Sequence, residues 1–521
     1  MNENSDYNLY ATDTPKRFFT ISECFFAWLC LIGGYVFWRF LPVDRAPLGG
    51  FLLVVITFIS TAIISRIKGA VLRPLPVIIG ISAIIVSTTL IICSNTFLYF
   101  FAYCYALAAY CYFIYAVNGN STKSGFNDLI LVDFIKSLFI LPFCSFGYLF
   151  KAIFTGRGKG NGKNFLKIIL GIAIALIPTG IVIYLLSYDN NFRELLKNIF
   201  NFRFIDFFTF TVRLTLAIPT AMYVYGLFIS ASEHKCSNVL TEDTCSRICS
   251  KVKFLPAATT LTAVIPLLAV YVLFFISQLD YYISGFTGVL PDGLSYADYA
   301  KEGFFQLCTV SVINLIVIII ASIFMQQKDA FGKKLLKAIS IAYSIVTLIL
   351  ISTALSKMFM YISYYGLTQK RVYSTWLMAV IAIIFVLLII RQFVPAFKIV
   401  ACSLTVCVVM FAGLTVANTD SLIAKYNVNC YLDGTLDEVD IDALLKLGDS
   451  SVPELVNLAK ELESRIDKNT ADKEEQSVYE ELILNLSRLS YHYKDENKEF
   501  YSYTIPYIRA QKSLKSLDLT E

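Results

Sequence analysis

The sequence predicts an all-α integral membrane protein with about eleven transmembrane helices, followed by a small helical extracytoplasmic domain. The first indication is composition, because 57% of the 521 residues are hydrophobic and only 16% are charged, against about a quarter in soluble proteins. The second is a series of apolar runs of about 20 residues, the length that crosses a bilayer core. The third is an uneven charge distribution, which separates a basic part of the chain from an acidic one.

The change in charge divides the chain into a cytoplasmic N-terminal segment at 1–20, a polytopic membrane domain at 21–417 and an acidic helical domain at 418–521. Residues up to 417 include 32 Lys/Arg and 18 Asp/Glu, a net charge of +14, whereas the later residues include 12 and 21, a net charge of −9. Lys16 and Arg17 precede the first apolar run, and no small-residue cleavage site follows it. We therefore expect a retained anchor and not a removable signal peptide.

Eleven segments have the length and composition of a transmembrane helix. Polar or Gly/Pro-bearing connections such as RIKGAVLRP and VNGNSTKSG separate them. The predicted spans are 21–41, 48–65, 75–94, 96–117, 168–187, 207–231, 255–277, 305–325, 338–358, 374–391 and 399–417.

One further apolar segment, 134–154, is not counted as a span. Lys136 and Lys151 enclose only fourteen residues of it, and Pro142 lies between them. This length suits an interfacial or re-entrant helix near 128–154, which we place on the cytoplasmic side. If the segment crossed the membrane, the basic loop that follows it would lie outside, against the preference of Lys and Arg for the cytoplasmic side.

Orientation follows from the positions of the basic residues. With the N-terminus in the cytoplasm, 22 of the 32 Lys/Arg of the membrane domain lie on the cytoplasmic side and eight lie outside. Eleven spans then place the C-terminus outside. The stretch LSYADYAKEGFFQL at 294–307 falls on that same outer side, and Ser295 with Asp298 forms a capping-box pattern at the start of a helix.

Polar residues from three connections share the outer side and form a candidate outward-facing polar site. The alternative is an interfacial helix start with tyrosines at the membrane boundary and solvated charges. The candidate residues are Gln278, Tyr296, Asp298, Tyr299, Lys301, Glu302, Lys357, Tyr361, Lys370 and Arg371.

Four segments in order, FFISQLDYY, LPDGLSYADYAKEGFFQL, KMFMYISYYGLTQKRVYSTW and DSLIAKYNVNCYLDGTLDEVDIDALLKLGDSSVPEL, resemble a family of bacterial multi-pass membrane proteins described only as a domain of unknown function. The resemblance covers about 250–460. It implies a multi-pass protein of the bacterial inner or plasma membrane, with an acidic C-terminal appendage, and it supplies no activity. Where such proteins often have Arg after YA, this chain has Lys301, which cannot form a bidentate contact with an anion.

Two motifs raise the question of a metal, and we predict neither a metal nor a cofactor. The segment HKCSNVLTEDTCSRIC (234–249) holds one histidine and three cysteines, but their spacing matches no familiar zinc site, so free thiols are the alternative that we favour. The acidic residues between Asp433 and Asp442 do not follow an EF-hand pattern and suit the first turn of a helix. The remaining C-terminal sequence predicts a bundle of three to five helices.

Three classes of function remain open. The first is a non-enzymatic protein that interacts with or regulates other envelope components, with the acidic domain 418–521 as its docking surface. The second is a transporter or lipid-handling protein that uses the outward-facing polar site. The third is a membrane enzyme acting on a lipid-linked substrate, with Asp298 or Glu302 as a base. We expect membrane lipid as a partner, envelope proteins as a further one, and no nucleic acid.

Overall fold

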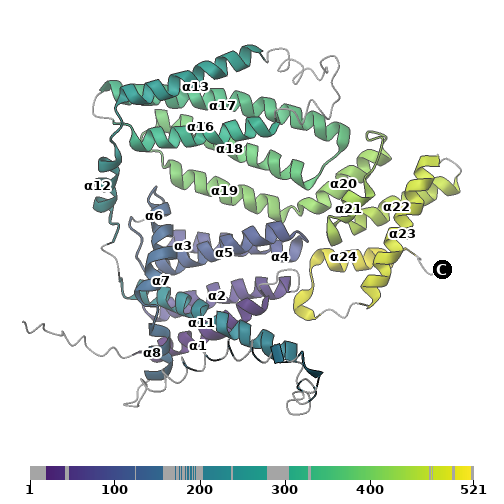
Figure 1. The fold of residues 1–521 in the computed structure, drawn as a ribbon, viewed down its shortest axis with the longest axis horizontal. Coiled ribbons are helices and arrows are strands. Elements are labelled where there is room, and N and C mark those ends of the chain that lie inside the picture. The colour runs from purple at the N-terminus through teal and green to yellow at the C-terminus, as the bar shows by residue number, and fades with distance from the viewer. Residues whose placement is uncertain are drawn as a thin grey trace, which may run out of the picture. The chain divides into compact units, whose positions relative to one another are not determined.

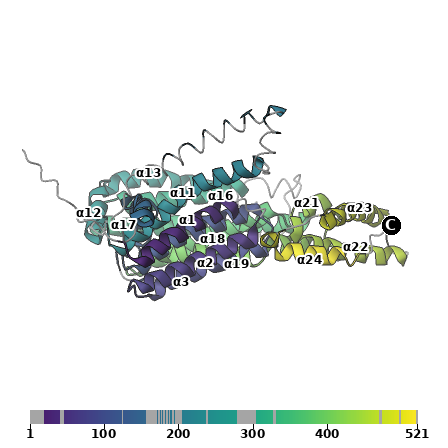
Figure 2. The ribbon, with the colours of Figure 1, turned by 90° about the horizontal axis from the view of Figure 1, so that it is seen from below.

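The computed structural model shows an all-helical protein, and Figures 1 and 2 give two views of it. Within the described residues no strand is found beyond an isolated bridge between Leu255 and Met325. The described residues are 19–40, 46–123, 125–155, 204–235, 239–277, 304–326, 330–468, 471, 473–495 and 499–517, with isolated positions between 171 and 194.

Ten helices in the described part of the chain are long and apolar enough to cross a membrane. They confirm ten of the eleven predicted spans; the eleventh, 168–187, lies almost entirely outside the described residues. The helices are α1 (Ile21–Phe40), α2 (Pro47–Ile67), α3 with α4 (Pro74–Ser87 and Thr89–Ile92), α5 (Thr96–Val117), α11 (Phe204–Ser232), α13 (Ala257–Ser277), α16 (Phe304–Phe324), α17 (Ala330–Tyr365), α18 (Gln369–Phe393) and α19 (Ile399–Val416).

Helix α17 is longer than the sequence predicts. The predicted span ends at 358, whereas the helix continues to Tyr365 and has 36 residues in all. After 358 no glycine or proline occurs until Gly366, which has a φ of +73° and ends the helix in the left-handed conformation. Since 36 residues rise about 54 Å, α17 extends beyond a hydrocarbon core of about 30 Å.

The segment near 128–154 forms two helical stretches that bend by 51° at a short break, Ile130–Cys144 and Tyr148–Phe154. The first stretch comprises α6 (Ile130–Ile135), a π-helical turn at Lys136–Ile140 and α7 (Leu141–Cys144); α8 (Tyr148–Thr155) follows the bend. This geometry is that of a re-entrant helix or of a broken span, so the place of the segment in the membrane remains a prediction.

The chain divides into two compact units, which we describe separately. The smaller comprises 1–39 and 141–233. In it, α1 packs closely on α11: a Cβ added to Gly34 would lie 2.8 Å from the carbonyl oxygen of Ala217. The indole Nε1 of Trp38 donates a 2.9 Å hydrogen bond to Oγ1 of Thr220. Small residues and a side-chain hydrogen bond between helices are typical of packing within membranes.

The larger unit comprises 40–140 and 234–521 and holds most of the membrane helices. A buried polar network joins three of them: the Tyr271 hydroxyl of α13 donates to Oδ1 of Asn314 in α16 over 2.5 Å, and the Asn314 amide donates to Oγ1 of Thr347 in α17 over 2.9 Å. Burial of a polar side chain in a span is costly unless it is hydrogen-bonded, and here each partner satisfies the other.

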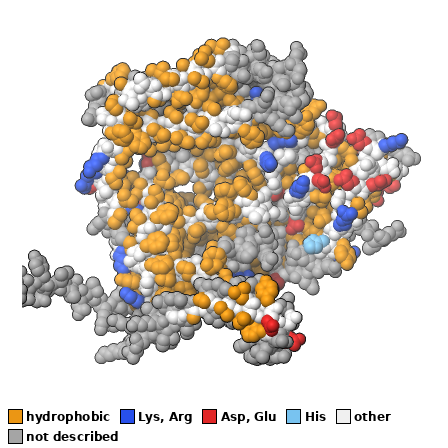
Figure 3. Space-filling model, viewed as in Figure 1, with side chains coloured by type: hydrophobic (Ala, Val, Ile, Leu, Met, Phe, Trp, Pro, Cys, Tyr) orange, Lys and Arg blue, Asp and Glu red, His pale blue; other side chains and the backbone are white. Residues whose placement is uncertain are grey.

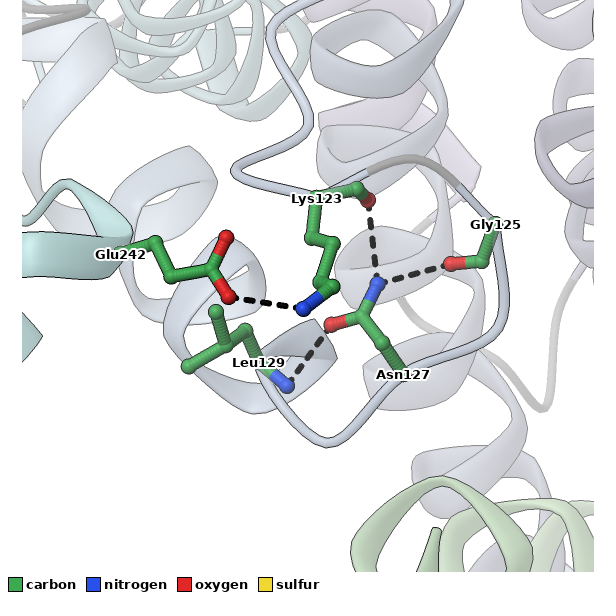
Figure 4. A network of polar contacts seen from close by, with 5 residues as sticks. All are labelled: Lys123, Gly125, Asn127, Leu129 and Glu242. Atoms are coloured by element: carbon green, nitrogen blue, oxygen red, sulfur yellow. Dashed lines mark hydrogen bonds and ion pairs between the residues drawn. The ribbon is translucent and has the colours of Figure 1, made fainter. Parts of the chain in front are cut away.

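The connection between α5 and α6 is ordered by its own polar groups (Figure 4). The Asn127 amide donates to the carbonyl oxygens of Lys123 and Gly125 over 3.0 and 2.8 Å, and its Oδ1 accepts the Leu129 backbone N–H over 2.8 Å. Lys123 also pairs with Glu242 at the start of α12 (Glu242–Val252), over 2.7 Å. These bonds replace the helical ones that the turn leaves unmade.

The C-terminal residues form a helical bundle, as the sequence predicts. In Figure 2 it lies beyond the ends of α18 and α19, which belong to the same unit. Its core is built from aliphatic side chains such as Ile423, Leu455 and Leu482. The helices are α20 (Thr419–Leu432), α21 (Ile441–Leu445), α22 (Val452–Asp467), α23 (Lys473–Asp495) and α24 (Ile505–Leu514), with 3₁₀ turns at Gly448–Ser450 and Phe500–Ser502.

Candidate functional site at the domain junction

The turn between α17 and α18 meets the C-terminal domain through side-chain hydrogen bonds. Arg371, in the first turn of α18, donates to the carbonyl oxygens of Tyr365, over 2.8 Å, and of Gly366. Its guanidinium also lies 4.0 Å from the ring centre of Tyr361. A cation at these carbonyls satisfies the unpaired acceptors at the end of α17 and opposes the helix dipole.

Asn427 of α20 binds the next residue of the turn at both backbone groups. Its Oδ1 accepts the N–H of Leu367 over 2.7 Å, and its Nδ2 donates to the carbonyl oxygen of Leu367 over 2.8 Å. A Cβ added to Gly366 would lie 2.4 Å from the same Oδ1, so glycine is needed here for space as well as for its positive φ. The side chain thus substitutes for a backbone partner across the junction.

A second contact joins α18 to α20 through Asp420, which is buried, with 1% of its surface exposed. The Gln369 amide donates to Oδ1 of Asp420 over 2.8 Å. The other carboxyl oxygen, Oδ2, is buried and makes no hydrogen bond of good geometry with the described residues. Asn95 lies nearby, where its Nδ2 donates to the Tyr373 hydroxyl over 2.8 Å and its Oδ1 caps the start of α5.

Burial raises the pKa of Asp420 above the ordinary aspartate value, because the charged form loses its hydration. The amides of Gln369 and Asn95 act in the opposite direction, and burial is the larger effect. The junction therefore contains a carboxyl group that binds a proton more tightly in the folded chain than in the unfolded one.

Two smaller contacts complete the junction at the α4–α5 connection. The Cys93 thiol donates to the carbonyl oxygen of Thr415 near the end of α19, over 3.1 Å. Ser450 of the C-terminal domain donates to the hydroxyl of Ser94 over 3.3 Å. Together with Asn95, these residues bring the ends of four membrane helices, α4, α5, α18 and α19, to one place.

An acidic loop at 433–442 lies against the α17–α18 turn. Its backbone is fixed, because the N–H groups of Thr435 and Leu436 both bond to the carbonyl oxygen of Cys430, over 2.8 and 3.0 Å. Leu436 is buried and faces Gly366. Figure 3 shows acidic side chains gathered over this part of the bundle. The exposed carboxylates of the loop are those of Asp433, Asp437, Glu438, Asp440 and Asp442.

Four of the ten predicted site residues belong to the described chain. Tyr361 and Arg371 are in contact, with the Arg371 guanidinium 4.0 Å from the centre of the Tyr361 ring. Lys370 is exposed beside them, and Lys357 is buried in α17, one helical turn before Tyr361. The other six residues, Gln278, Tyr296, Asp298, Tyr299, Lys301 and Glu302, lie outside the described residues. Whether all ten form one site remains a prediction.

Sequence reasoning missed the four polar residues that make the junction, namely Asn95, Gln369, Asp420 and Asn427. Asp420 sits in the segment NTD at the start of a helix, where an acid usually serves as a solvated first-turn residue. Asn427 lies in a helix of mixed polarity, with no spacing that separates it from other surface asparagines. Their role depends on contacts between residues some 50 to 330 positions apart, and periodicity carries no such information.

The described residues include no group of three or more histidine, cysteine or acidic side chains arranged for a metal ion. Part of the segment considered for zinc, including Cys236, lies outside those residues. Two partly buried contacts, Asn427 with Leu367 and Asp420 with Gln369, connect the α17–α18 turn and the start of α18 to the C-terminal domain.

Comparison with known proteins gives one match. A family described as a domain of unknown function (DUF4153) matches residues 80–458, which include the whole junction and the acidic loop. No curated protein and no solved structure matches the chain. Since the matched residues make up more than half of the sequence, the chain belongs to this family, to which no biochemical activity is assigned.

Proposed function

We propose that this is a multi-pass protein of the bacterial cell membrane that, without catalysing a reaction, interacts with or regulates other components of the cell envelope. Its N-terminus lies in the cytoplasm and its C-terminal domain lies outside. The acidic loop 433–442 is the docking surface, and the junction connects that surface to the membrane helices.

The observation that carries the proposal is the pair of hydrogen bonds between Asn427 and the backbone of Leu367. A flexible appendage would need no such contact, because a tether alone would keep it near the membrane. Here α20, which leads into the acidic loop, is hydrogen-bonded to the α17–α18 turn, and Leu436 of the loop packs beside Gly366, so a displacement of the loop reaches the turn. This is the arrangement expected of a protein whose external domain reports on, or responds to, a partner.

The charge of the loop supports a basic partner. Within the described residues, no hydrogen bond or ion pair is made by the side-chain carboxylates of Asp433, Asp437, Glu438 and Asp442. These carboxylates therefore repel one another in the free protein. A surface rich in Lys or Arg would relieve that repulsion and would be guided to the loop over about a Debye length.

The test is a neutralised loop with a matched control. The variant Asp437→Asn, Glu438→Gln, Asp442→Asn removes three charges and spares Asp440, which caps α21. The control, Glu461→Gln, Glu463→Gln, Asp467→Asn, removes three exposed charges from α22. The envelope proteins that copurify with the full chain from native membranes are compared at low and high salt.

Loss of a salt-sensitive partner from the loop variant alone supports the proposal. Retention of every partner by both variants, or equal loss from both, contradicts it. The second result would mean that overall charge, and not the loop, governs association.

One observation favours a transporter or lipid-handling protein as the second candidate. Lys357 is an ionisable residue buried in a candidate span, and such residues often line a substrate path. In proteoliposomes, Lys357→Met would then abolish flux of a substrate or lipid while the chain still inserts and folds. The docking function, in contrast, predicts that partner binding by this variant is unchanged.

A further inference from the structure

The last helix of the C-terminal domain differs in charge from the rest of the domain. Residues 500–517 carry three basic side chains and no acidic one, although the domain 418–521 has a net charge of −9. Six of the exposed side chains of this segment form what we call the basic edge; they are Phe500, Ile505, Ile508, Arg509, Lys512 and Lys515.

The basic edge begins where the bundle meets the membrane helices. The 3₁₀ turn Phe500–Ser502 packs against α2, and α24 packs against α4. The ring of Tyr501 lies 5.3 Å from that of Phe40, seven residues before α2 begins at Pro47. Figure 2 shows α24 beside the ends of the membrane helices that belong to this unit. The turn is therefore at the level where the spans leave the hydrocarbon core.

Phe500 is 77% exposed at this level, and Ile508 is 53% exposed. In water, exposure of large apolar side chains in a small patch is unfavourable. The adjoining surface of α2 is also apolar and exposed, with Leu52, Ile56, Ile59 and Ile63 spaced along one face of the helix. Such a face on a span contacts lipid, and the turn that begins the basic edge packs against this same helix.

From the packing of this turn against α2, the exposed Phe500 and the local charge we propose that the basic edge binds the surface of a bilayer that contains anionic phospholipid. Phe500 and Ile505 enter the interface beside α2, where aromatic and aliphatic side chains are favoured. The headgroup phosphates are bound by Arg509, Lys512 and Lys515. Of these three residues, Arg509 lies nearest in the sequence to the apolar residues of the edge. The C-terminal domain is then held to the membrane on its basic edge while its acidic loop stays free for a partner.

The experiment uses the full chain in nanodiscs with a trace of photoactivatable phosphatidylglycerol or, separately, of photoactivatable phosphatidylcholine. After irradiation, digestion behind Glu499 releases the peptide that starts at Phe500, and its lipid labelling is measured. The variant is Arg509→Gln, Lys512→Gln, Lys515→Gln. The control, Lys468→Gln, Lys473→Gln, Arg488→Gln, removes three exposed charges elsewhere in the domain. The single variant Arg509→Gln is used in addition, in case the triple variant folds poorly.

We expect the peptide to be labelled more by phosphatidylglycerol than by phosphatidylcholine in the wild type and in the control. Each basic residue lost should lower that preference by up to about fivefold. Absence of labelling by either lipid would overturn the proposal and assign the edge to a protein partner. Equal labelling by both lipids, unaffected by the substitutions, would overturn the recognition of anionic headgroups.

Discussion

The side-chain amide of Gln369 donates a 2.8 Å hydrogen bond to Oδ1 of the buried Asp420, and this bond joins the first turn of α18 to the first turn of the C-terminal domain. In this bond the Asp420 carboxylate acts only as an acceptor, and the side-chain oxygen of an asparagine would accept the same bond. The difference between the two lies in charge, which gives the first prediction.

Asp420→Asn should keep the bond to Gln369 through Oδ1 and should change the free energy of unfolding by less than about 1 kcal/mol near neutral pH, or increase it. Asp420→Ala should lower it by about 1–3 kcal/mol, because the Gln369 amide is left without its acceptor. Unfolding in detergent by denaturant measures both. A destabilised Asn variant that resembles the Ala variant would show that the charge itself holds the junction.

The raised pKa of Asp420 predicts a pH dependence of stability with a definite sign. Between the unfolded and the folded pKa, the folded chain binds more protons than the unfolded chain, so the stability contributed by this group falls as pH rises through that interval. The stability that Asp420 contributes is fully present below the ordinary aspartate pKa of 3.8. The difference in stability between wild type and Asp420→Asn should therefore shift in favour of the Asn variant as pH increases from acid to neutral. A difference independent of pH would contradict this.

Asn427→Ala should destabilise the junction, because it leaves both backbone groups of Leu367 without partners. The expected cost is about 1–3 kcal/mol for each orphaned group that stays shielded from water. Asn485→Ala is the matched control, since its amide bonds only within α23, at an exposed position. Proteolytic cleavage between α18 and α20 should become faster in the first variant only. Equal rates in both would refute the role of Asn427.

At the other end of the larger unit, the Asp133 carboxylate accepts bonds from the Thr122 backbone N–H, over 3.1 Å, and from the Thr122 hydroxyl. Lys136 is 3% exposed and donates to that hydroxyl over 2.9 Å. Asp133→Ala should cost about 3–5 kcal/mol, because it leaves a buried cation without its counter-charge.

The exposed pair of Lys123 and Glu242 provides the contrast. Lys123→Ala should cost about 0–1 kcal/mol, since water screens this ion pair. The thermal unfolding of both variants in the same detergent gives the comparison. A Lys123 variant as unstable as the Asp133 variant would show that the surface pair, and not the buried group, organises the 118–129 connection.

The spans were predictable because a bilayer imposes one length and one polarity on every helix that crosses it. Hence runs such as 96–117 and 399–417 give their helices almost to the residue. The end of α17 was not predictable in this way, since the tyrosine-rich residues after 358 are also compatible with a connection at the membrane boundary. Likewise, Tyr361 and Arg371 could be placed on one side of the membrane from charge alone, but their contact could not.

The residues of the junction were beyond sequence reasoning for a different reason. Asp420 and Asn427 have polar side chains in a polar domain. The burial of Asp420 and the hydrogen bonds of Asn427 to a distant element are what distinguish them. Burial of a polar group depends on tertiary contacts, whereas hydropathy and periodicity describe neighbours in the chain. The basic edge was missed because the charges of 418–521 were summed, and the net charge of −9 conceals the three basic residues of 500–517.

The account depends most on the side of the membrane at which the C-terminal domain and its acidic loop lie. In bacterial cells, alkaline phosphatase and green fluorescent protein are fused in turn after Glu521 of the full chain, with matched fusions after Gln326 as the control. We predict active phosphatase and no fluorescence at Glu521, and the reverse at Gln326. Fluorescence without phosphatase activity at Glu521 would place the domain in the cytoplasm and contradict its role as an external docking surface.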